Sequence, residues 1–141
     1  MNTEALEARS AALETFAKDV LHAADFPGDV HRFAPFACPR CGVVPLALRI
    51  EHHSGSEPFD FKGVVHARCA ECGVREAVFG FTGEHRRSTH VEQPRCECGH
   101  EYFWTAMCER YEGADGWFFD EGVLVGMCAA CRKCHTFVFT D

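Results

Sequence analysis

Paired cysteines are the residues of this sequence with the clearest capacity for chemistry. Cys38 and Cys41 form a CxxC motif followed by Gly42, and Cys69 and Cys72 repeat that motif further along the chain. A glycine after the second cysteine permits the positive φ that such a tight turn tends to need. Four thiolates in a tetrahedron suit Zn²⁺, and a closed Cys₄ shell leaves no open position for water. We therefore predict a structural zinc site here, with disulfides as the alternative.

A second set of cysteines has a similar but less regular spacing. A CxC pair replaces the first CxxC, and the second half offers two overlapping CxxC pairs. The alignment of the two sets selects Cys128 and Cys131, whereas local spacing allows Cys131 and Cys134 equally well. The predicted ligands are Cys96, Cys98, Cys128 and Cys131, with Cys134 as an alternative ligand. His100 could replace one thiolate, but we expect it to be a strand residue. Two zinc ions per chain follow from this assignment.

The two cysteine sets lie in segments that look like copies of each other. A shift of 58 residues aligns Phe79 with Phe137, and a shift of 57 aligns Cys41 with Cys98. Shifts that differ by single residues are what small loop insertions produce, and they indicate an internal duplication. A shift of 59 residues carries Phe59, Gly63, Val64, Cys69, Ala70 and Cys72 onto Phe118, Gly122, Val123, Cys128, Ala129 and Cys131.

These cysteine turns resemble those of the zinc-ribbon superfamily, arranged as two ribbons in tandem over residues 35–141. The pattern departs from the superfamily at the CxC pair and at Arg132, where a glycine would be usual. The resemblance implies antiparallel strands held by a metal knuckle. It does not imply one function, because the superfamily includes nucleic-acid readers, transcription and translation accessories, and protein adaptors. A rubredoxin-like Fe(Cys)₄ electron carrier has similar cysteine spacing and is a further alternative.

The elements that must position these residues are one helix and several short strands. Apolar residues recur at helical spacing over residues 3–24, and Pro27-Gly28 ends that pattern. Beyond it, Val, Phe and Leu runs alternate with turn residues, as in antiparallel strands. The predicted strands are Val43–Glu51, Phe59–Ala67, Arg75–Phe81, Glu101–Glu109, Trp117–Val125 and Thr136–Thr140.

The predicted fold is therefore small, metal-stabilised and mainly β: an N-terminal α-helix followed by two antiparallel β zinc ribbons related by internal duplication. We divide the chain into a helix and connector (residues 1–30), ribbon 1 (31–83), a linker (84–95) and ribbon 2 (96–141). We expect the helix to pack on the body of the protein. The alternative is a dimerisation or docking helix.

Charge argues against general nucleic-acid binding. The formal net charge is −7, and two Cys₄ zinc sites would lower it further, since eight thiolates bring more charge than two Zn²⁺ ions return. The linker holds the one locally basic stretch, in which Arg86 and Arg87 form a weak candidate contact for phosphate or RNA. No apolar run approaches the roughly 20 residues of a membrane span. We expect a cytoplasmic protein with reduced thiols and no membrane partner.

No catalytic motif stands out. His52 and His53 beside Glu51 could suggest a metal dyad, but neighbouring strand residues point to opposite faces and cannot easily share one ion. We expect no enzyme. We expect most aromatic residues to fill the small cores. Some of the others should be exposed and form a protein interface, and the candidates are Trp104, Trp117, Phe118 and Phe119. The predicted function is a non-catalytic, zinc-stabilised protein-interaction module with an unidentified partner. A transcription- or translation-associated nucleic-acid binder is the alternative.

Overall fold

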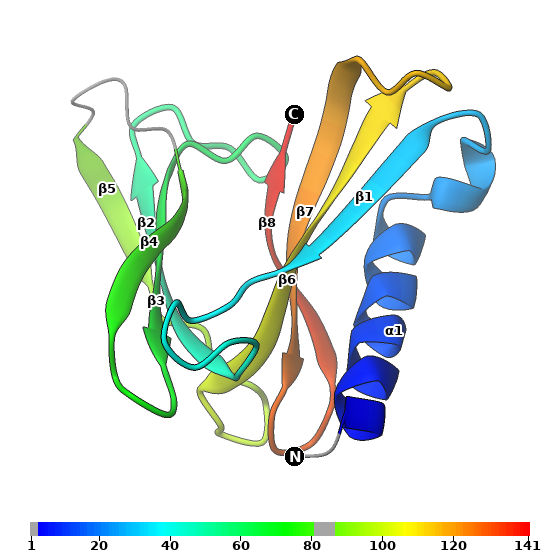
Figure 1. The fold of residues 1–141 in the computed structure, drawn as a ribbon. Helices are drawn as coiled ribbons and strands as arrows, with labels where there is room; N and C mark the ends of the chain where they lie inside the picture. The colour runs from blue at the N-terminus through cyan, green and yellow to red at the C-terminus, as the bar shows by residue number, and fades with distance from the viewer. Residues whose placement is uncertain (1–2, 81–86) are drawn as a thin grey trace.

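The computed structural model describes residues 3–80 and 87–141, which form one N-terminal helix and an eight-stranded antiparallel sheet (Figure 1). The helix α1 spans Thr3–Val20, and a short 3₁₀ turn, η1, spans Ala23–Asp25. The strands are β1 (Val30–Pro35), β2 (Leu46–His53), β3 (Gly63–Cys69), β4 (Arg75–Gly80), β5 (Ser88–Glu92), β6 (Tyr102–Glu112), β7 (Phe118–Cys128) and β8 (Cys134–Thr140). A small, mainly β fold behind an N-terminal helix was predicted, and the structure confirms it.

The sheet consists of two halves that meet at one corner. The first half-sheet contains β5, β2, β3 and β4, and the second contains β1, β6, β7 and β8. They are joined where Leu46 and Ala47 of β2 pair with Phe103 and Tyr102 of β6. Figure 1 shows the two halves facing each other, with β8 lying toward the first half-sheet.

The two halves share the same strand register. Leu46 pairs with Cys69 in the first half, and Phe103 pairs with Cys128 in the second. Both outer hairpins also carry a bulge at the corresponding place, after Val65 in β3 and after Leu124 in β7. The duplication stays a prediction, which this matched register supports.

The register corrects one detail of the sequence alignment. Val65 pairs with Phe79, and the corresponding Leu124 pairs with Val138. Phe79 therefore corresponds to Val138 and not to Phe137. The unpaired residue of the bulge is Val78 in β4 and Phe137 in β8. Phe79 follows directly after Val78, so a one-residue slip of the alignment matches Phe79 to Phe137.

The burial pattern of each strand depends on whether one or both of its faces are covered. In β3 alternate residues are buried, because only one face of the first half-sheet is covered. In β7 the run Gly122–Cys128 is buried throughout, because both of its faces are covered. One core lies between the half-sheets and includes Ile50, Val65 and Leu124. The other lies under the helix.

Helix α1 covers the outer face of the second half-sheet. Leu13, Ala17 and Leu21 are almost fully buried, and they pack in one cluster with Val123 and Val125 of β7. The apolar stripe of the helix therefore packs on the body of the protein, as expected. The helix ends at Val20, earlier than the predicted residue 24, because the chain turns at His22 into η1.

Two strands were not predicted. Strand β1 lies almost wholly within the range assigned to ribbon 1, yet it pairs with β6 of the second half-sheet. Strand β5 lies in the segment assigned to the linker, and it pairs with β2. Both strands are short and neither contains a buried residue, so their sequences carry no regular apolar alternation.

Candidate metal centres

The first cluster gathers four sulfur atoms at the start of β2 and the end of β3. The thiols of Cys38, Cys41, Cys69 and Cys72 all lie within 4.8 Å of one another. The Sγ atoms of Cys38 and Cys72 are 3.6 Å apart. The sequence nominated these four residues, and the fold brings them together because β2 and β3 pair in the register that places Leu46 opposite Cys69.

Two tight turns shape this cluster. The backbone N–H of Cys38 donates to the carbonyl of Gly42 at 2.8 Å, and Gly42 has a φ of 79°. In the second turn Glu71 N–H donates to the Cys69 sulfur at 3.3 Å, and Gly73 has a φ of 75°. Backbone N–H groups pointing at sulfur stabilise the thiolate that a metal needs.

The second cluster forms between β6 and β7 in the same way. Cys96, Cys98, Cys128 and Cys131 bring their sulfurs within 4.8 Å of one another. The sulfurs of Cys96 and Cys131 are 3.4 Å apart, and those of Cys98 and Cys128 are 3.6 Å apart. The shorter CxC spacing therefore still presents both thiols to one point.

Arg132 occupies the place that Gly73 holds at the first cluster. Its φ is 67°, although it is not a glycine, and its backbone N–H donates to the carbonyl of Cys128 at 3.0 Å. The turn is thus conserved in shape where the sequence departs from the usual pattern.

Within each cluster the environment shifts the pKa values of different thiols in opposite directions. Hydrogen bonds from backbone N–H groups, chiefly that of Cys72, lower the pKa of Cys69 to about 7. Burial and the neighbouring thiols raise the pKa of Cys41 to about 12. At Cys128 burial is outweighed by the backbone N–H groups of Cys131 and Ala130, and the pKa falls to about 7. One thiolate forms readily in each cluster, but four require a bound cation.

The donor set fits a tetrahedral thiolate-binding metal. Four Cys ligands are the set of structural zinc sites and equally of Fe(Cys)₄ centres. A filled Cys₄ shell has no place for a substrate, so each centre would hold strands together rather than carry out hydrolysis.

The remaining cysteines lie outside both clusters. Cys134 is half-buried under α1 rather than beside the other sulfurs, and burial raises its pKa. Cys108 is fully buried, and burial raises its pKa to about 11. His100 lies outside the four-sulfur group, and it lies before the start of β6 rather than in a strand as expected. Its ring packs against Tyr102. His135 was not expected at the second cluster, yet its Nε2 lies 3.3 Å from the Cys96 sulfur and can donate to it.

The structure describes only one of the two arginines that were proposed to contact phosphate. Arg86 lies outside the described residues. Arg87 is exposed just before β5, and its carbonyl accepts a hydrogen bond from Ser54 N–H at 3.0 Å. The weak phosphate contact at these arginines therefore stays a prediction.

Comparison with known proteins adds no assignment. No family of proteins, no curated protein and no solved structure matches this chain. Within the described residues, no helix has the length and apolar character needed to cross a membrane.

Proposed function

We propose that this protein is a non-catalytic, zinc-stabilised protein-interaction module of the cytoplasm. Its two Cys₄ clusters lie at the end of the molecule where β3 and β7 finish, which leaves the opposite end free for recognition. A metal-anchored sheet of this kind holds a surface rigid without a large core.

The observation that carries the proposal is a pair of exposed aromatic residues. Trp117 and Phe118 are 79% and 74% exposed, at the end of the β6–β7 hairpin remote from the second cluster. Trp104, also considered for this role, is buried beneath Arg9 of α1. Large aromatic side chains in water mark protein interfaces because their burial on binding is strongly favourable.

Affinity purification with cross-linking in the native host tests this proposal. Proteins captured by the wild type should be lost with the double variant Trp117→Ser/Phe118→Ser. Val43→Ser is the matched control, since Val43 is an exposed apolar residue near the first metal cluster. Identical captured proteins for all three forms would contradict an interface at the hairpin.

A second candidate, nucleic-acid binding, is favoured by the outer face of the first half-sheet. Arg68 and Arg75 lie directly opposite each other on β3 and β4, and Arg49 lies opposite His66. They line a pocket of about 190 Å³. Like charges placed opposite each other destabilise a sheet, and a phosphate would offset that repulsion. Against it, Arg68 already pairs with Glu101 at 3.1 Å, and the net charge is −7.

Titration with labelled RNA and DNA separates the two candidates. The interaction module should bind nucleic acid weakly at about 150 mM salt. Sub-micromolar binding that Arg75→Glu abolishes and Lys62→Glu preserves would promote the second candidate. An electron carrier would instead contain iron and be coloured.

A further inference from the structure

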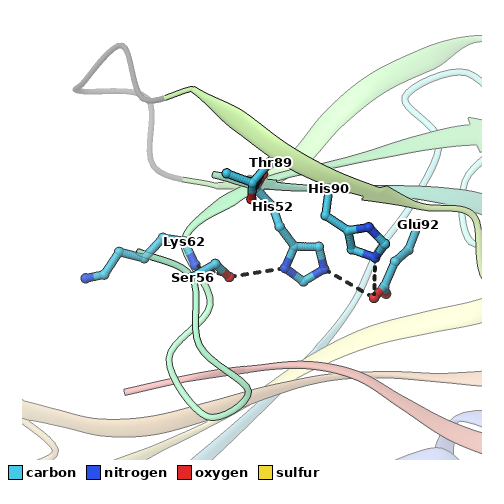
Figure 2. A network of polar contacts seen from close by, with 6 residues as sticks. All are labelled: His52, Ser56, Lys62, Thr89, His90 and Glu92. Atoms are coloured by element: carbon cyan, nitrogen blue, oxygen red, sulfur yellow. Dashed lines mark hydrogen bonds and ion pairs between the residues drawn. The ribbon is translucent and has the colours of Figure 1, made fainter. Parts of the chain in front are cut away.

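A histidine-rich cluster lies away from both cysteine sites, on the face of the first half-sheet that looks toward β8 (Figure 2). His52 lies near the end of β2, and its direct partner across the strands is His90 of β5. Glu92 follows two residues later on β5 and therefore shares that face. A pocket of about 350 Å³ opens beside His52 and Glu92, with Phe61 and Phe139 in its wall.

One carboxylate oxygen faces both imidazole rings. Glu92 Oε1 is 3.2 Å from His90 Nε2 and 3.5 Å from His52 Nε2. Two nitrogen or oxygen ligands about 2.0–2.2 Å from one tetrahedral ion lie roughly 3.3–3.6 Å apart. These two separations are close to that range, whereas Nε2 of His52 and Nε2 of His90 lie more than 4.8 Å apart. The ring of His90 must therefore move toward His52 to complete a site. The side chain of His90 is 60% exposed, so its ring has room to move closer to that of His52.

The ring of His52 is held in place from its other side. Its Nδ1 lies 3.1 Å from the hydroxyl oxygen of Ser56, and that oxygen accepts a hydrogen bond from the backbone N–H of Lys62 at 3.2 Å. When Nδ1–H donates to Ser56, Nε2 presents its lone pair toward Glu92. Metal-binding histidines are oriented by just such a bond on the second nitrogen.

The inward nitrogen of His52 lacks a hydrogen bond. His52 Nε2 is buried and has no hydrogen-bond partner among residues 3–80 and 87–141. It faces a carboxylate oxygen across 3.5 Å. A buried polar atom without a hydrogen bond is costly, and a cation bound between this nitrogen and the carboxylate would satisfy both groups.

We propose that His52, His90 and Glu92 bind a third divalent metal ion of the first transition row, such as Zn²⁺. Two imidazoles and one carboxylate suit these ions and differ chemically from the thiolate clusters. Three protein ligands leave at least one coordination position open, and in this fold it adjoins the pocket between β2 and β8. Unlike the Cys₄ centres, this site can accept water or a small anion on the metal.

Cobalt titration of the full chain tests the proposal, after both Cys₄ clusters have been filled with zinc. The wild type should bind one equivalent of Co²⁺ in addition to two zinc ions. Its visible spectrum should show ligand-field bands of nitrogen and oxygen ligation, without the intense thiolate charge-transfer absorption. His52→Ala, His90→Ala and Glu92→Gln should each weaken this binding by more than about 100-fold, and Ser56→Ala by about 10-fold.

His66→Ala is the matched control, because His66 also lies near a glutamate, Glu51 at 3.9 Å, but on the opposite face of the first half-sheet. It should retain the third ion. Each variant must keep its two zinc ions and its circular dichroism, which shows that loss of cobalt is not loss of the fold. The proposal is overturned if the wild type binds no Co²⁺ at millimolar concentration, or if cobalt binds His52→Ala as tightly as the wild type.

Discussion

Arg132 and Gly73 occupy the same turn at the two metal clusters, yet only one of them is a glycine. Both have φ near 70°, a conformation that costs an L-residue with a side chain about 1–2 kcal/mol. The departure from the zinc-ribbon pattern thus leaves the geometry intact and adds local strain.

We predict that Arg132→Gly raises the free energy of unfolding by about 1 kcal/mol, because glycine adopts this φ without a Cβ penalty. Gly73→Ala should lower it by a similar amount. Denaturant titration of the zinc-loaded proteins measures both changes. A loss of stability in Arg132→Gly would show that the arginine side chain has a stabilising contact of greater weight.

Single cysteine variants test which four thiols bind the metal at the second cluster. Cys134→Ser should leave the zinc content unchanged, because Cys134 lies outside the four-sulfur group. Cys128→Ser should lose one ion and unfold the second half-sheet. Elemental analysis of the two purified variants checks this. The opposite pattern would mean that Cys131 and Cys134 form the second half of the site.

The two remaining thiols should be unreactive in the folded protein. Burial raises the pKa of Cys108 to about 11, so at pH 8 only on the order of one molecule in a thousand carries the reactive thiolate there. Iodoacetamide labelling followed by mass spectrometry should modify Cys108 only after the protein is unfolded. Rapid labelling of Cys108 in the native, zinc-loaded protein would contradict its burial under α1.

At the scale of elements, strongly patterned segments were predictable and weakly patterned ones were not. Helix α1 and six strands were predicted because each has an apolar face that must be buried. Strand β5 was read as linker, since all five of its residues are exposed. The fold places His90 and Glu92 beside His52 only through β5, so that cluster could not be found from the sequence. The two cysteine clusters were predictable because each ligand pair is local in sequence.

The docking of α1 should contribute much of the stability of the second half-sheet. Leu13 is 3% exposed and packs in the same cluster as Val123 of β7. Leu13→Ala should therefore cost about 3 kcal/mol, through lost burial and the cavity that remains. Asp19→Ala, at an exposed position of the same helix, should change stability by less than about 0.5 kcal/mol. Equal effects in urea titrations would mean that the helix is not docked in solution.

At the scale of the whole molecule, each half-sheet has a Cys₄ cluster at one end and is joined to the other half at Leu46 and Phe103, directly beside both clusters. Each half-sheet is small, so we expect its core to need further support. If the two Cys₄ clusters bind metal as proposed, the free energy of metal binding should appear as free energy of folding. An isolated helix of 18 residues is marginal in water, so we expect α1 to depend on its packing against the second half-sheet.

The metal content of the dialysed protein tests this account most directly. After dialysis against a mild chelator that competes for the open histidine site, elemental analysis should find two zinc ions per chain in a colourless, folded protein. A strong chelator should then remove both ions and abolish the β signal in circular dichroism. One ion per chain, iron in place of zinc, or a fold that persists without metal would contradict the central claim that two Cys₄ zinc centres hold this molecule together.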